Sequence, residues 1–336
     1  MSRSLDVAVI GATGSVGEAL VQVLQEREFP IGTLHALAGA ESVGQTVSYK
    51  GRNLRVREMQ TFDFSTVQVV FFAAGQSVTA QHIDAARAAG CIIIDLAGGL
   101  PSEQAPRVVP EVNPQALEKL NAPYVVTSPA SISVALGCVL AALGANVTVE
   151  RINLTACLAV SSRGREGVSE LARQTAELLN GRAFEPQVFG RQMAFNMLPQ
   201  VDQPDAQGHG ALEQRVAAEL KELFAAPKLK TSITCLQAPV FFGDSLSVSL
   251  QTTKTVDIAK VCDVLQRAPA LECVEFEDYP TVVGDAVGQD LIYVGRVRAG
   301  LDDPAELNLW IASDNVRKGA AINAVQLAEL LIKHYL

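Results

Sequence analysis

The stretch VIGATGSVG, residues 9–17, decides the fold of the N-terminal half. It follows the apolar run LDVA and precedes the amphipathic run EALVQVLQER, so a strand, a glycine-rich turn and a helix are predicted in direct succession. In this spacing one glycine makes the turn, one lets the backbone approach a pyrophosphate, and one packs the helix on the sheet. Helix N-terminal N–H groups then bind phosphate oxygens. The pattern predicts a dinucleotide site, or a turn whose glycines serve packing alone. Its residues are Gly11, Thr13, Gly14, Ser15, Val16 and Gly17.

The rest of the chain shows two kinds of strand pattern. LHALA, VVFF and CIIID are continuously apolar and alternate with helical patterns, which predicts a Rossmann-like, doubly wound parallel sheet. From residue 149 onward, segments such as ERINLTACL and DSLSVSLQTT alternate polar with apolar residues, which indicates a mixed sheet with one covered face. The tail, residues 318–336, is predicted as one long amphipathic helix. The fold class is therefore α/β, with a second domain of α+β type.

Composition limits the classes of partner. The chain has 336 residues, enough for two domains, and a net charge of −9, which argues against nucleic acid and anionic membranes. No apolar run is long enough to span a bilayer, and the N-terminus enters a strand without a signal peptide, so we expect a cytoplasmic protein. The six cysteines show no paired spacing, so we expect reduced, mostly buried thiols and no metal site.

Glu41 lies where cofactor choice is normally set, just after the second strand, in LAGAESVG. A carboxylate there accepts a hydrogen bond from a free ribose 2′-hydroxyl and repels a 2′-phosphate. If a dinucleotide, NAD or NADP, binds, we therefore expect NAD to be preferred by on the order of 1–3 kcal/mol. The alternative is that Glu41 is a solvated loop residue.

The stretch VVTSPASISVALG, residues 125–137, predicts a strand that breaks at Ser128 and Pro129 and a buried helix that begins near Ser131. Enzymes use such a turn to hold a nucleophile at a helix N-terminus, where the dipole favours negative charge. A cysteine would suit that position, and this chain offers the hydroxyl of Ser131.

Five motifs in order make the chain resemble the aspartate-semialdehyde dehydrogenase family over nearly its whole length. They are the glycine turn, VVPEVN at 108–113, TSPASIS at 127–133, APVFFGDSLSV at 238–248 and DNVRKGAAINAVQLAE at 314–329. The resemblance implies a homodimer and an NADP-linked reductive dephosphorylation of aspartyl phosphate. It also implies a nucleotide domain formed by residues 1–131 and 317–336, and a dimerisation and catalytic domain formed by residues 132–316. Asn315 would be a further cofactor residue.

The chain differs from the family at the positions of the family's catalytic residues. It is therefore most similar to the Usg-type paralogues, which lack the catalytic cysteine. Ser131 stands in place of the nucleophilic cysteine, Asp244 in place of the basic histidine, and Gln237 in place of the substrate-binding arginine. Leu158, Pro101 and Glu41 replace further family residues. Four polar residues persist that could line the cleft or merely face solvent or a partner: Arg163, Arg165, Glu213 and Arg215.

Three functions remain open. The first is a homodimer that holds a nucleotide and a small-molecule ligand without the ancestral activity. The second is an active NAD(P)-dependent oxidoreductase acting on an aldehyde or acyl phosphate in amino-acid biosynthesis. The third is a hydrolase that uses Ser131 and Asp244. The third requires Asp244 to act as a base, and a carboxylate is a weak base unless burial raises its pKa.

Overall fold

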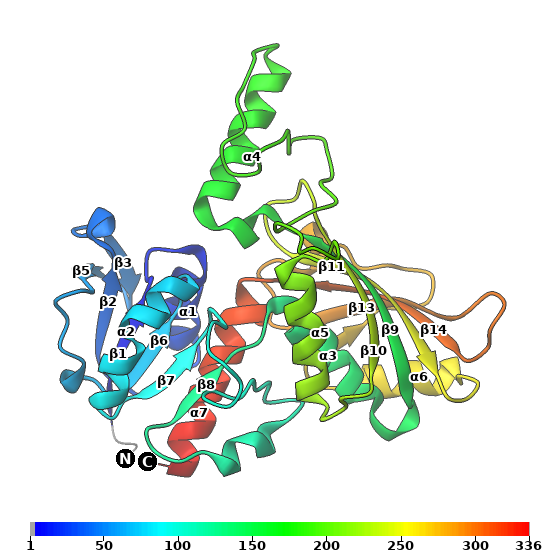
Figure 1. Cartoon of the computed structure of the whole chain (residues 1–336), viewed down its shortest axis with the longest axis horizontal. Coiled ribbons are helices and arrows are strands. Elements are labelled where there is room, and N and C mark those ends of the chain that lie inside the picture. The colour runs from blue at the N-terminus through cyan, green and yellow to red at the C-terminus, as the bar shows by residue number, and fades with distance from the viewer. Residues whose placement is uncertain (1–3, 336) are drawn as a thin grey trace. The chain divides into compact units, whose positions relative to one another are not determined.

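The computed structural model describes residues 4–335, and the chain divides into two compact units. One unit holds the chain up to Ala130 and resumes at Ala320, and the other runs from Ser131 to Gly319 (Figure 1). The domain boundaries expected from the sequence were 131/132 and 316/317.

The first unit is built on a parallel sheet with the strand order β5-β2-β1-β6-β7-β8. All of its strand pairs are parallel, which confirms the Rossmann-like prediction. The strands are β1 (Leu5–Ile10), β2 (Ile31–Ala38), β5 (Arg57–Glu58), β6 (Val69–Phe72), β7 (Ile92–Asp95) and β8 (Val125–Thr127).

Helices cover both faces of this sheet. Helices α1 (Ser15–Glu26) and α7 (Asn323–Tyr335) contribute to the core on one face, and α2 (Gln76–Ala88) contributes to the core on the other. Successive residues of β6 point to opposite faces of the sheet. Val69 and Phe71 belong to the first core, whereas Val70 and Phe72 belong to the second. Strands buried on both faces must be apolar throughout, as the sequence is.

The second unit is built on a mixed sheet with the order β10-β9-β11-β14-β13-β12. The outer pairs β10/β9 and β12/β13 are parallel and the inner pairs are antiparallel, so the prediction of a mixed sheet is confirmed. The strands are β9 (Val149–Leu158), β10 (Lys230–Gln237), β11 (Asp244–Thr252), β12 (Leu271–Cys273), β13 (Ile292–Ala299) and β14 (Glu306–Ser313).

The π-helical turn Val282–Ala286 packs against Tyr293 of β13 and Ala312 of β14, and the opposite face of the sheet is covered by α-helices of the same unit. The helices α3 (Ser131–Leu143), α5 (Ala211–Leu223) and α6 (Ile258–Gln266) pack on it. On β11, Leu246, Val248 and Leu250 are buried, whereas Ser247, which points the other way, is exposed. This alternation is what a one-sided sheet requires.

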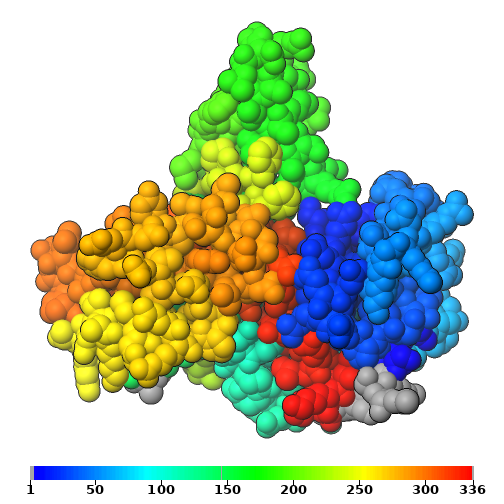
Figure 2. Space-filling model, turned by 180° about the vertical axis from the view of Figure 1, so that it is seen from behind, coloured from blue at the N-terminus to red at the C-terminus, as the bar shows by residue number. Residues whose placement is uncertain are grey.

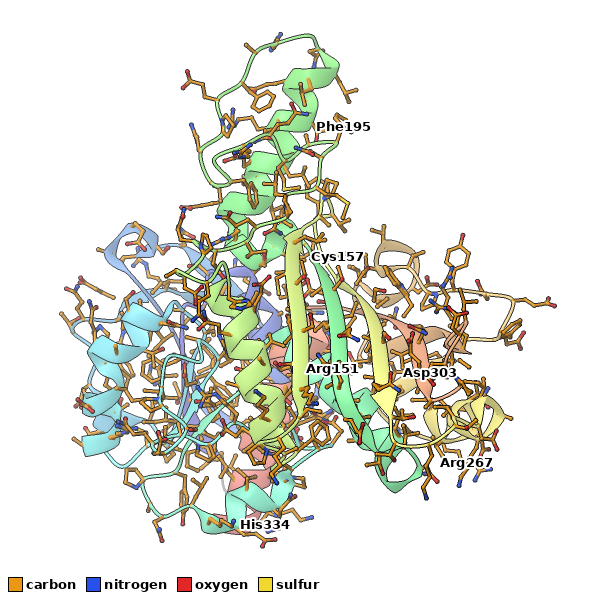
Figure 3. The ribbon with its side chains drawn as sticks, turned by 45° about the vertical axis from the view of Figure 1, so that its right-hand side comes forward. Arg151, Cys157, Phe195, Arg267, Asp303 and His334 are labelled. Carbon is orange, nitrogen blue, oxygen red and sulfur yellow. The ribbon has the colours of Figure 1, made fainter. Side chains whose placement is uncertain are left out.

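An arm stands out from the rest of the second unit, formed by α4 (Gly164–Leu179) and the chain that returns to α5 (Figures 1 and 2). It has a small apolar cluster of its own that includes Leu171 and Met193. The buried carboxylate of Glu170 accepts hydrogen bonds from the backbone N–H groups of Gln187 and Val188, which fastens the returning chain to α4. Phe195 lies exposed on this arm (Figure 3).

Some local predictions differ from the structure. The tail helix begins at Asn323 and is preceded by a π-helical turn, Arg317–Ile322, because Asp314 accepts the first N–H groups of that turn. The short hairpin β3 (Thr46–Tyr49) and β4 (Arg52–Arg55) was not predicted, and neither was α6. All six cysteines are free thiols, as expected. Within residues 4–335, no helix combines the length and apolarity needed to cross a membrane.

Candidate active site

The glycine turn of the first unit separates two roles of glycine. Gly11 has a φ of +78°, and a Cβ on Gly17 would lie 2.1 Å from the carbonyl oxygen of Gly11, so both positions are glycine for reasons of packing. A Cβ on Gly14 would meet only one protein atom, at 3.3 Å. Packing is thus less strict at Gly14, the N-cap of α1, where the missing side chain leaves space beside the helix N-terminus. That is the space a pyrophosphate would occupy.

Glu41 lies in a short turn, Ala40–Ser42, directly after β2. Its carboxylate lies over Gly39, where a Cβ would come within 2.6 Å of Glu41 Oε1. The hydroxyl of Thr13 donates to Ser42 at 3.3 Å, which ties this turn to the glycine turn. Thr13, Ser42 and Glu41 therefore belong to one surface at the ends of β1 and β2, with the Glu41 side chain exposed.

In the second unit, α3 begins at Ser131, as the sequence predicted. The half-buried side chain of Ser131 has room because Gly319 has no side chain: a Cβ there would lie 2.6 Å from the Cβ of Ser131. The Ser131 hydroxyl donates to Asp244 Oδ2 at 2.8 Å. The two residues are 113 positions apart in the sequence, so this contact depends on the tertiary fold.

The carboxyl of Asp244 is buried, with 3 % of the residue exposed. Burial raises its pKa to about 6, against the hydrogen bonds from Ser131 and from the Ala159 N–H, which lower it. The nearby charge of Asp314 raises the pKa further. Asp244 is therefore a stronger base than an ordinary aspartate and is still mostly ionised at neutral pH.

Gln237 contacts the carbonyl of Ala159, the residue whose N–H binds Asp244, and is 1 % exposed. Its amide nitrogen donates to the carbonyl oxygens of Leu158 and Ala159, each at 2.8 Å. Since a side-chain amide has two N–H groups, none remains for a substrate carboxylate. Gln237 fixes the backbone beside Asp244 rather than offering the guanidinium that the family resemblance associates with this position.

Both polar atoms of the Asn315 side chain also have hydrogen-bond partners within the protein. Its side-chain oxygen accepts from the N–H of Gly243 at 2.9 Å, and its amide exchanges hydrogen bonds with Ser161. Gly243 has a φ of +89° and immediately precedes Asp244, so Asn315 holds the turn that places the carboxyl. The backbone of Ala159 and Gly243 thus links the contacts of four side chains within the second unit: Ser131, Asp244, Gln237 and Asn315. No sequence pattern indicated the parts played by Ala159 and Gly319.

The four polar residues that could have lined the cleft have other surroundings in the structure. Arg163 donates to the carbonyl of Val201 and lies 3.6 Å from Asp202. Glu213 accepts from the N–H groups of Gly210 and Cys235, and Arg215 pairs with the buried Glu219 at 2.7 Å. Arg165 is exposed on α4. Among the described residues, no group of three or more histidine, cysteine or acidic side chains is placed to hold a metal ion.

The raised pKa of Asp244 makes the free energy of unfolding depend on pH. The folded pKa of about 6 exceeds the ordinary value of 3.8, so the folded state holds this proton more tightly than the unfolded state. The stabilising contribution is complete below pH 4 and is lost as pH rises through 6, a total of about 3 kcal/mol. Asp244→Asn removes this titrating group. We therefore expect the free energy of unfolding of Asp244→Asn, minus that of wild type, to be about 3 kcal/mol higher at pH 8 than at pH 4.

Urea unfolding of both proteins across this range measures the difference. Asp302→Asn, which removes an exposed carboxyl, is the control and should show no such trend. A difference between wild type and Asp244→Asn that is constant with pH would contradict the raised pKa.

Comparisons with known proteins agree with this architecture. The model of the semialdehyde dehydrogenase NAD-binding domain matches residues 6–120, and the model of the semialdehyde dehydrogenase dimerisation domain matches residues 140–318. The chain is 60 % identical over 333 residues to a USG-1 protein homolog from Azotobacter vinelandii, covering 99 % of each chain. It is 40 % identical over 336 residues to aspartate-semialdehyde dehydrogenase 2 from Vibrio cholerae, covering all of both chains.

A solved structure gives the same result. The structure of a probable aspartate-semialdehyde dehydrogenase from Pseudomonas aeruginosa is 56 % identical, with a TM-score of 0.97 over 99 % of this chain and all of that one. The resemblance deduced from the motifs is therefore confirmed, including its Usg-type character. The chain belongs to the aspartate-semialdehyde dehydrogenase family and has its NAD-binding and dimerisation domains.

Proposed function

We propose that this protein is a cytoplasmic homodimer that binds a nicotinamide dinucleotide and a small-molecule ligand but does not catalyse the family's thiol-dependent reductive dephosphorylation. The observation that carries the proposal is the pair formed by Ser131 and Asp244, 2.8 Å apart, at the positions where the resemblance implies a cysteine and a histidine. A bound nicotinamide ring would supply hydride transfer. The chain's own groups would have to supply the covalent acyl intermediate.

The chemistry of a hydroxyl argues against that step. A thioester forms readily because a cysteine becomes a thiolate near neutral pH, whereas a serine hydroxyl is far more basic and needs its proton removed during attack. A thioester also passes its acyl group to hydride more readily than an ester does. Gln237 adds a second obstacle, because its amide is committed to two backbone carbonyls and cannot pair with the substrate's carboxylate.

We expect no oxidation of aspartate semialdehyde above background when the purified protein is assayed with phosphate and either NAD or NADP. Removing members of a catalytic unit eliminates most of the rate, and their contributions are not additive. Turnover near 1 s⁻¹, an ordinary enzymatic rate on an order-of-magnitude scale, would contradict this expectation. Dinucleotide binding measured on the same sample shows that the protein is folded.

The choice of dinucleotide rests on the surface formed by Thr13, Ser42 and Glu41. Because Gly14 has no side chain, backbone at the N-terminus of α1 can approach the pyrophosphate that NAD and NADP share. The Glu41 turn is tied to the same loop through Thr13 and Ser42, which supports a position for its carboxylate beside the adenosine ribose of a bound cofactor. A carboxylate there accepts from a free 2′-hydroxyl and repels a 2′-phosphate.

We therefore expect NAD to bind about tenfold to a hundredfold more tightly than NADP, which corresponds to about 1–3 kcal/mol. Calorimetric titration of each cofactor measures the ratio, and Glu41→Arg should narrow or reverse it. Glu26→Arg, a charge reversal at the exposed C-terminal end of α1, away from the glycine turn, is the matched control. Equal affinities that Glu41→Arg leaves unchanged would mean that Glu41 is only a solvated loop residue.

The homodimer is proposed to form through the face of the mixed sheet opposite α3, α5 and α6. Ser247 is exposed on this face, flanked in register by Thr155 and Trp310, which are half-buried. A hollow of about 540 Å³ beside Trp310 gives room for side chains of a second copy. A half-exposed tryptophan on an open sheet face is the kind of residue that interfaces bury.

We expect the protein to sediment as a dimer at micromolar concentration, and Ser247→Arg to shift it toward monomer because a long charged side chain would interrupt the packed face. Ala259→Arg places the same side chain on the exposed side of α6 and should leave the dimer intact. A monomeric wild type would overturn the homodimer. A dimeric Ser247→Arg would assign the interface to another surface.

A further inference from the structure

The hydroxyl of Ser131 and the carboxyl of Asp244 form a pair that the proposed binding function does not use. Ser131 Oγ donates to Asp244 Oδ2 at 2.8 Å, and Asp244 Oδ1 accepts from the Ala159 N–H at 3.1 Å. The carboxyl is therefore oriented by a backbone donor on one oxygen, while its other oxygen takes the proton of the serine. This is the geometry in which a base activates a hydroxyl nucleophile.

The surroundings hold both partners in place. On the serine side, Gly319 has no side chain and so leaves the space that Ser131 occupies. On the carboxyl side, Asn315 binds the N–H of Gly243, the residue directly before Asp244. A pair that is fixed before substrate arrives does not lose conformational freedom during the reaction.

Asp244 has the properties of a usable base. Burial raises its pKa to about 6, so at neutral pH it is largely ionised and yet holds a proton better than an exposed aspartate would. The titratable groups that interact with it are Asp314 and the thiols of Cys157 and Cys235. Asp314 opposes ionisation, and the pKa values of both thiols are raised, to about 12 for Cys235, so these thiols stay neutral at pH 7.

We propose that Ser131 is a nucleophile and Asp244 its general base, and that the pair transfers acyl groups from activated acyl compounds to water. Ser131 Oγ attacks the acyl carbon as its proton passes to Asp244. The bond from that carbon to the leaving oxygen breaks, and an ester to Ser131 remains. Asp244 releases to solvent the proton that it took from Ser131. Water then attacks the ester as Asp244 takes a proton from that water. The acid is released and Ser131 regains its proton, so no redox partner is required.

The pair itself limits the substrate class. Neither Ser131 nor Asp244 hydrogen-bonds to a histidine within residues 4–335. The carboxyl has little capacity to protonate a basic leaving group, so amides are excluded. An acyl phosphate or an aryl ester has a leaving group that departs without a proton and fits this limit.

The helix that carries Ser131 favours the negative charge that develops on the acyl oxygen. Ser131 is the first residue of α3, a helix of 13 residues with no acidic residue in its first turn. Backbone N–H groups and the helix dipole at this end both stabilise an oxyanion. The nucleophile and the oxyanion donors therefore belong to the same turn of chain.

The test uses p-nitrophenyl acetate and acetyl phosphate as probes, without dinucleotide, on the full-length protein. We expect hydrolysis by wild type, with a rate that rises with pH through about 6 and then levels off as Asp244 becomes ionised. Ser131→Ala should abolish it, and Asp244→Asn should lower it about 100-fold or more, the usual contribution of a general base. Ser169→Ala removes an exposed serine of α4 and should have no effect.

A second readout does not depend on turnover. An organofluorophosphate should add its phosphoryl group to Ser131 with release of fluoride, detected as a mass increase on the peptide that contains residue 131. Labelling should be lost when the protein is unfolded and should be slowed by Asp244→Asn. Hydrolysis or labelling that persists at the wild-type rate in Ser131→Ala would overturn the proposal, as would the complete absence of both in wild type. Neither result bears on dinucleotide binding, so failure here leaves the proposed function standing.

Discussion

Burial of the Asp244 carboxyl is the constraint on which the second unit depends. A buried charge is costly unless it is hydrogen-bonded, and this carboxyl has two donors, the hydroxyl of Ser131 and the N–H of Ala159. The turn before it requires the positive φ of Gly243, which Asn315 secures. The start of α3, the end of β9 and the start of β11 are thus fixed relative to one another by one carboxylate.

The pair formed by Ser131 and Asp244 bears on which parts of the family's chemistry we propose that the protein retains and lacks. Gly14 is the N-cap of α1, a position at which the glycine turn can approach a phosphate. A hydroxyl at 131 and a carboxyl at 244 are poorly suited to a thioester but suited to an ester with a good leaving group. Under the proposed function, the residues at 131 and 244 affect acyl transfer and leave hydride transfer to the bound dinucleotide.

The sequence predicted much of the fold and part of the site. The glycine turn, the parallel sheet, the mixed sheet and the start of α3 at Ser131 follow from local patterns, because strand and helix periods and turn glycines are local properties. The pairing of Ser131 with Asp244 was suggested only by the family resemblance. Its distance, the burial that raises the pKa of Asp244, and the occupation of Gln237 by backbone carbonyls depend on contacts between residues far apart in sequence. The π-helical turn before α7 was missed because it depends on Asp314, which lies outside the apolar pattern of the helix.

The central claim is that Asp244 is a buried base poised near neutrality beside the Ser131 hydroxyl. Its most direct test is the carboxyl-carbon NMR signal of Asp244 in protein labelled with ¹³C-aspartate, assigned by its absence in Asp244→Asn and followed from pH 3 to pH 9. The account predicts a titration midpoint near 6. A midpoint near the ordinary value of 3.8 would mean that the carboxyl is solvated, and the account of the site would be wrong.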